Sequence, residues 1–212
     1  MKYLSIAACI AFFFSGSHAG GQETARFAPL RPDQLSEEQK AWADSITAPP
    51  RKANFANPPY RAYIRAPELA KRVIPLSDYV RWNTSLPPRL SELAILITAR
   101  EWTAQYEWHA HYPLAIKGGL DPKIAADIAA GKRPDGMKAD EAAVYDLAKE
   151  LYRDKTVSDA TYKAARDQFG ERGIMEIISI IGYYDLVSMT LITMQAEPPS
   201  NSVVPPLPPL PK

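Results

Sequence analysis

Hydrophobic positions recur along this chain at helical rather than alternating spacing. Ala143, Leu147 and Leu151 repeat every four positions between residues 139 and 151, which is the spacing of one face of an α-helix. Alternating apolar runs bounded by hairpin turns, the signature of strands, are missing from the sequence. We therefore predict an all-α fold built as a single helical domain.

Capping residues and prolines set the expected helix boundaries. Ser36, with Gln39 three residues later, forms a capping box that predicts a helix to about Ile46. Prolines make 48–59 a wrapping loop. The remaining helices are expected from about 60 to 66, from 67 towards 82, from about 89 onwards, through 106 to 117, and over 121–130, 138–154, 158–169 and 171–195.

Two of these helices are unusually apolar. The helix that begins near Arg89 is apolar on all faces, so we expect it to be buried. The last helix, 171–195, is long enough to cross a membrane, but Glu176 and Asp185 lie within it. Charged residues are rare in membrane spans. We therefore predict a central or subunit-interface helix and no membrane span in the mature chain.

The N-terminal residues resemble a secretory signal. Lys2 precedes an apolar run over 4–14, and Ser17-His18-Ala19 is a suitable cleavage site. We predict a signal peptide over residues 1–19 and a periplasmic or secreted protein, with an uncleaved anchor as the alternative. Residues 20–35 should be extended.

The C-terminal residues are rich in proline. The segment 197–212 ends Pro-Pro-Leu-Pro-Pro-Leu-Pro-Lys, which favours polyproline II or disorder over helix. We favour a solvated spacer over a ligand for a partner domain. The helical domain is then expected over residues 36–196.

Composition removes several classes of function. The only cysteine is Cys9, inside the predicted signal, so the mature chain should lack disulfides, thiol catalysis and thiolate metal sites. Loss of Lys2 with the signal leaves 24 basic residues against 24 acidic ones. That balance gives no indication of nucleic-acid binding.

Candidate chemistry concentrates in Glu107-Trp108-His109-Ala110-His111. Glu107 and His111 are four residues apart and share a helix face, whereas His109 and His111 point about 200° apart. A carboxylate beside an imidazole selects its tautomer and raises its basicity, which suits proton transfer. The alternative is a structural Glu–His pair within a helix interface.

A third candidate, Glu92, lies in the apolar stripe of the preceding helix. Burial would raise the pKa of its carboxyl and make it a proton donor, whereas a plain first-turn acid is the alternative. Glu92, Glu107 and His111 could supply three metal ligands, but no established metal-binding spacing is present, and we predict no metal.

Aromatic residues surround this segment. They offer flat surface for a ring-shaped ligand, although such residues are more often core. We predict that Trp108 and His109 bind substrate. The aromatic set is Trp102, Tyr106, Trp108 and Tyr112.

The motifs Ser91-Glu92-Leu93-Ala94-Ile95-Leu96 and Tyr106-Glu107-Trp108-His109-Ala110-His111 resemble the carboxymuconolactone decarboxylase and alkylhydroperoxidase D superfamily. The resemblance extends over about 55–195. It implies the helical bundle of the alkylhydroperoxidase D-like type, assembled as a homotrimer or hexamer.

The hydroperoxidase branch of this family uses a glutamate, two cysteines and a histidine as a thiol relay. By resemblance these fall on Glu92, Ala104, Glu107 and His111. Both sulfurs are absent, so peroxidase activity is disfavoured. The decarboxylase branch, which acts on a carboxylated lactone without metal or organic cofactor, is similar at Glu107 and His111.

The resemblance therefore implies a cofactor-free lyase or proton-transfer enzyme acting on a small carboxylated or cyclic molecule. His111 would transfer the proton, Glu107 would orient it, and Glu92 would be a second acid or relay. A substrate carboxylate would need an arginine, and the candidates are Arg89, Arg100 and Arg172. Alternatives are a non-catalytic small-molecule-binding protein, a peroxidase-type role, and an interaction module acting through the Pro-rich tail.

Overall fold

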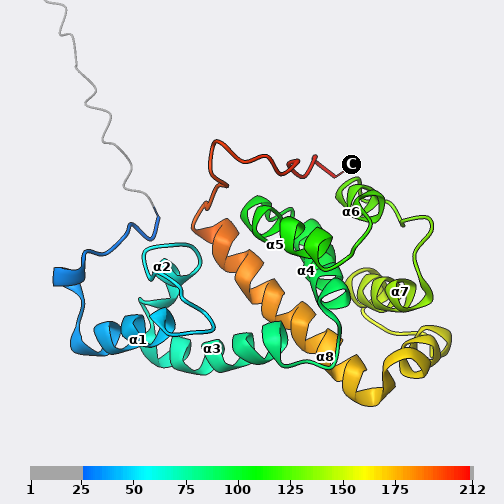
Figure 1. Cartoon of the computed structure of the whole chain (residues 1–212), viewed down its shortest axis with the longest axis horizontal. Coiled ribbons are helices and arrows are strands. Elements are labelled where there is room, and N and C mark those ends of the chain that lie inside the picture. Colours follow the sequence, from blue (N-terminus) through cyan, green and yellow to red (C-terminus); the bar gives the residue numbers. More distant parts are fainter. Residues whose placement is uncertain (1–25, 211–212) are drawn as a thin grey trace, which may run out of the picture.

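Residues 26–210 are described by a computed structural model, and they form a layered bundle of helices (Figure 1). No strand occurs within this range, so the all-α prediction is confirmed. The predicted signal peptide, 1–19, lies outside the described residues. The elements are η1 (Pro32–Gln34), α1 (Glu37–Thr47), α2 (Tyr60–Tyr63), α3 (Pro67–Trp82), α4 (Pro88–Trp102), α5 (Gln105–Lys117), α6 (Pro122–Ala129), α7 (Ala139–Asp154) and α8 (Asp159–Thr193).

Helix α4 is the centre of the bundle. It contacts α5, α6, α7 and α8, and an unbroken run from Leu93 to Arg100 is buried. The sequence predicts this burial because the helix is apolar on all faces.

A sharp turn joins α4 to α5 and sets the position of the candidate residues. Thr103 adopts a left-handed conformation with φ of 51°, and the Ala104 amide donates to the Ala99 carbonyl at 2.8 Å. The left-handed residue ends α4 in the way that helix C-caps commonly do. The chain then reverses, so residues early in α4 lie beside the middle of α5.

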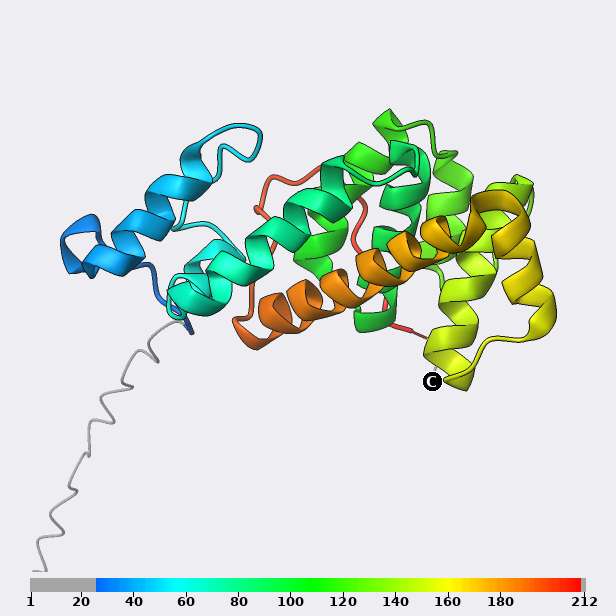
Figure 2. The same ribbon diagram turned by 90° about the horizontal axis from the view of Figure 1, so that it is seen from below.

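Helix α8 crosses the bundle diagonally (Figure 2). Gly170, with φ of 63° and ψ of 177°, interrupts it where the sequence predicts a new helix to begin. It is the one described helix long and apolar enough to cross a membrane, but 56% of its apolar window is buried in the fold. Its buried Glu176 accepts hydrogen bonds from Tyr79 (2.7 Å) and from the Ser85 amide (2.8 Å). These contacts hold α8 in the core, which agrees with the prediction of a central helix.

The Pro-rich segment after α8 packs across α5 instead of extending into solvent (Figure 1). Leu207 is only 3% exposed. Gln105 donates to the Leu207 carbonyl at 2.7 Å and accepts from its amide at 3.0 Å, while Arg100 donates to the Pro208 carbonyl at 2.6 Å. The prediction of a solvated spacer is therefore wrong, because helix side chains satisfy the backbone groups that this segment cannot satisfy itself.

Candidate active site

The imidazole of His111 lies between two carboxylates. Its Nδ1 is 2.6 Å from Glu92 on α4, and its Nε2 is 3.1 Å from Glu107 on α5. Helical spacing accounts for the Glu107 contact, whereas the Glu92 contact needs the reversal at Thr103. The structure thus brings together all three residues predicted to be catalytic.

Burial and charge act in opposite directions on this imidazole. His111 and Glu107 are buried, and the side chain of Glu92 is 14% exposed. Burial lowers the pKa of His111, but the two carboxylates outweigh it and raise the pKa from 6.5 to about 9. At neutral pH the group is therefore a positively charged proton donor.

A cavity of about 150 Å³ opens beside this triad. Glu107 and His111 line it, but Glu92 does not. Its other polar walls are supplied largely by tyrosines and arginines. They are Tyr60, Tyr106, Tyr183, Tyr184, Arg51, Arg81 and Ser77.

Tyr183 and Tyr184 remain protonated at neutral pH. Burial raises the pKa of Tyr183 to about 12 and moves the pKa of Tyr184 well above its ordinary value. The ring of Tyr184 meets the His111 ring edge-on, with centroids 5.0 Å apart. This aromatic wall limits where the imidazole can lie.

The arginines of the cavity are Arg51 and Arg81, which sequence reasoning missed. Arg51 comes from the proline-rich loop before α2, and Arg81 comes from the last turn of α3. Neither is near Glu107 or His111 along the chain, and only the packing of α3 brings them there. The adjacent Arg81-Trp82 pair is the one local signal, since guanidinium groups stack on indole rings.

None of the three arginines predicted to bind a carboxylate lines this cavity. Arg89 pairs with Asp140 and Glu141 at 2.6 and 2.5 Å. Arg100 is occupied by backbone carbonyls, including that of Pro208 at 2.6 Å. The exposed Arg172 pairs with Glu176 at 3.0 Å. These groups are taken up in structural contacts.

Trp108 and His109, predicted to bind substrate, lie away from this cavity. The Trp108 indole donates to the Pro205 carbonyl at 3.0 Å, and His109 Nδ1 lies 2.7 Å from the Ser202 hydroxyl. Both residues therefore hold the Pro-rich segment. The sequence does not show which of the two faces of α5 that segment covers, and a role of Trp108 and His109 in substrate binding stays a prediction.

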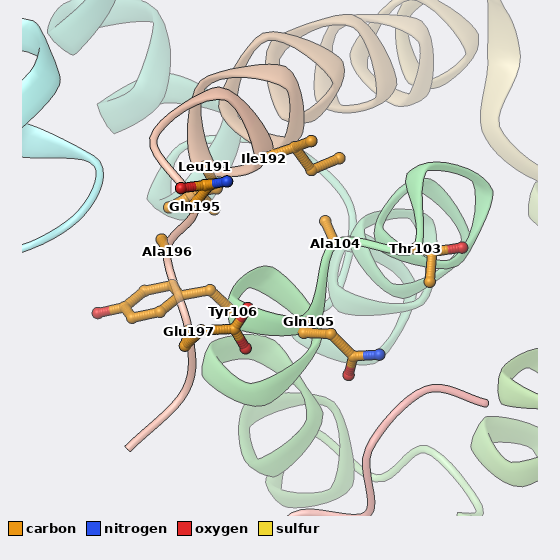
Figure 3. Close-up of a pocket in the computed structure, with 9 residues that line it drawn as sticks. All are labelled: Thr103, Ala104, Gln105, Tyr106, Leu191, Ile192, Gln195, Ala196 and Glu197. Carbon is orange, nitrogen blue, oxygen red and sulfur yellow. The ribbon is translucent and has the colours of Figure 1, made fainter. Parts of the chain in front are cut away.

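A larger hollow of about 500 Å³ lies between the start of α5 and the end of α8 (Figure 3). Tyr106 lines both hollows. The larger one does not reach Glu107 or His111, and Glu197 is the one carboxylate among its lining residues. We therefore place the candidate site in the smaller cavity.

The arrangement of the triad suits proton transfer better than metal binding. Glu92 and Glu107 contact opposite nitrogens of the imidazole, so the three groups do not converge on one point. Across residues 26–210, no group of three histidine, aspartate or glutamate side chains is placed to hold a metal ion.

Residues 67–150 match the model of the carboxymuconolactone decarboxylase family. This segment contains α4, α5 and the whole Glu92–His111–Glu107 triad. A comparison with curated proteins finds no match.

Solved structures share the fold. An uncharacterized peroxidase-related protein from Ralstonia eutropha JMP134, described as an alkylhydroperoxidase AhpD core, is 16% identical with a TM-score of 0.68, over 87% of this chain and 97% of that one. An uncharacterized peroxidase-related protein from Silicibacter sp. TM1040 is 14% identical with a TM-score of 0.64, over 86% and 97%. At these identities the likeness establishes the alkylhydroperoxidase D-like fold alone.

Proposed function

Because residues 67–150 place this chain in the carboxymuconolactone decarboxylase family, we propose that it is a cofactor-free lyase or proton-transfer enzyme acting on a small carboxylated or cyclic organic molecule. The observation that carries this proposal is the His111 imidazole, buried between Glu92 and Glu107 beside a cavity of about 150 Å³. The absence of an organic cofactor follows from resemblance to the decarboxylase branch.

The triad can supply the proton that a decarboxylation requires. When the bond to the substrate carboxylate breaks, carbon dioxide leaves and its electron pair remains on carbon, delocalised into a conjugated carbonyl as a dienolate. A proton from the His111 imidazolium then forms the new C–H bond, and solvent reprotonates the ring. We assign the Nε2 side to this step, because Glu107 lines the cavity and Glu92 does not.

Glu92 and Glu107 have different parts in this scheme. Glu92 holds Nδ1 from outside the cavity, so it orients the ring and keeps it charged. Glu107 contacts Nε2 at the cavity wall and orients this side of the ring towards the substrate.

Replacement of His111 tests this function. Wild type, His111→Gln and His109→Gln would be incubated in D₂O with a panel of small β,γ-unsaturated monocarboxylic acids whose double bond is conjugated to a carbonyl. Carbon dioxide release and deuterium incorporation at carbon are the measurements. We expect His111→Gln to lower the rate about 100-fold or more, and His109→Gln to stay near wild type because it lies outside the cavity. Equal rates in wild type and His111→Gln would contradict the assignment.

The non-catalytic alternative has a distinct outcome in the same experiment. A binding protein would return each acid chemically intact, with no deuterium at carbon and no loss of carbon dioxide, while still showing saturable binding. That result would indicate a non-catalytic protein that binds small molecules in the same cavity.

Assembly and export are also part of the proposal. We propose a homo-oligomer, a trimer or hexamer as the family resemblance implies. Apolar side chains left exposed along α8 support it, namely Met175, Ile178, Met189 and Ile192. We propose export because of the apolar run over 4–14 and the cleavage site that follows it. Light scattering measures the oligomeric state, and N-terminal sequencing of the exported protein identifies the cleavage site.

A further inference from the structure

We propose that Arg81 is the anion-binding residue of this cavity and that it selects small monocarboxylates. The inference rests on the proposed function and names its substrate class. Arg81 lines the same cavity as His111. No ion pair or hydrogen bond joins its guanidinium to another side chain within the described part of the chain, residues 26–210.

The position of Arg81 is set by an aromatic contact. Its guanidinium carbon lies 5.0 Å from the centroid of the Trp82 ring. A cation held over an indole keeps its N–H groups free at the edges of the guanidinium plane. An arginine held this way presents a planar fork of donors that matches the two oxygens of a carboxylate.

A second guanidinium lies on the same ring but is already occupied. Arg51 is 5.1 Å from the Trp82 centroid, and its side chain is only 5% exposed. It pairs with Asp78 at 2.5 Å and donates to Tyr60 at 2.8 Å. The charge of Arg51 is thus balanced within the protein, which leaves Arg81 as the cation available to a ligand.

The charges of the cavity favour a monoanion. The triad contributes two carboxylates around one imidazolium, so a ligand with two negative charges would meet net repulsion from that side. A single carboxylate at Arg81 gains a charge-assisted hydrogen bond while it leaves its uncharged end near His111.

The size and walls of the cavity restrict the rest of the ligand. Typical sites for drug-sized ligands are about 300 to 1,000 Å³, whereas this cavity is about 150 Å³. Tyrosine rings form much of the wall, including Tyr106 and Tyr184. A single small ring or a short unsaturated chain fits these limits.

Calorimetric binding of matched acids and amides tests the proposal on the full mature protein. The probes are benzoate, cyclohexanecarboxylate and their amides, with inorganic phosphate as the dianionic comparison. We expect wild type to bind the carboxylates at least tenfold more tightly than the amides or phosphate. Arg81→Gln should weaken carboxylate binding tenfold or more and change amide binding less than twofold.

Arg72→Gln is the matched control. It removes the same charge from the same helix, but Arg72 is 72% exposed and pairs with Glu68 at 3.0 Å, away from the cavity. We expect its carboxylate affinity to equal that of wild type, and circular dichroism should show all variants folded. If Arg72→Gln weakens carboxylate binding as much as Arg81→Gln does, the loss of net positive charge explains the effect and the proposal is contradicted.

Three other outcomes would also overturn it: no carboxylate binding in wild type, equal binding of acid and amide, or tighter binding of phosphate. The test is separable from that of the proposed function, because benzoate and cyclohexanecarboxylate are measured as ligands that are not turned over. Turnover without Arg81-dependent binding would support the proposed reaction and contradict the proposed anion site at Arg81.

Discussion

Glu92 and His111 are 2.6 Å apart although 19 positions and a chain reversal separate them in the sequence. Glu107, one helical turn from His111, completes the contact on the other nitrogen at 3.1 Å. Two carboxylates on one buried imidazole keep a proton where burial alone would remove it.

The stability of the protein should depend on the charge of His111. Burial lowers the pKa of this group, but Glu107 and Glu92 raise it from 6.5 to about 9. The stabilising contribution of the charged ring is therefore fully present below pH 6.5 and is lost as the pH rises through about 9. We expect NMR titration to place His111 near 9, and denaturant unfolding to show stability falling over that interval. A midpoint near 6.5 would contradict this.

Glu92→Gln should lower the pKa of His111 towards its ordinary range. The amide keeps the size of the side chain but removes one of the two negative charges that hold the proton. The upper pH limit of activity should move down with it. Glu101→Gln is the control, since Glu101 is on the same helix but pairs with Lys149 at 2.8 Å. NMR titration of His111 in both variants measures the effect, and identical pKa values would refute it.

Leu207 should contribute to stability as a core residue does. It is 3% exposed, and its backbone is held by Gln105. We expect Leu207→Ala to reduce the free energy of unfolding by about 2 kcal/mol or more. Leu210→Ala, at a side chain 44% exposed, should change it by about 0.5 kcal/mol or less. Equal effects in chemical denaturation would show that the segment is not docked in solution.

Peroxide consumption should stay at background. The positions that match the two family cysteines hold Ala104 and Glu107, and the described residues 26–210 contain no cysteine. A thiol relay needs a thiolate to attack the peroxide oxygen. An assay of hydrogen peroxide and an alkyl hydroperoxide with a dithiol reductant measures this. Robust turnover by a chain that begins at residue 20 would contradict the inference drawn from the missing sulfurs.

Much of the fold follows from local sequence. Ser36 and Gln39 form the predicted capping box, and Gly170 interrupts the helical run at the expected residue. The burial of α4 follows from its apolar residues on all sides. These features depend on neighbours within a few positions, which is the range over which capping, helical periodicity and glycine act.

The sequence by itself also determined the contact between Glu107 and His111, because residues four apart lie on the same face of a helix. The same spacing rule turns His109 away from that face. It could not determine what lies on each face of α5. Only the tertiary structure placed Glu92 on His111, brought Arg81 into the cavity from α3, and covered Trp108 with the Pro-rich segment. Those contacts join positions 19 to 97 residues apart. They depend on the packing of whole helices, which local sequence patterns do not encode.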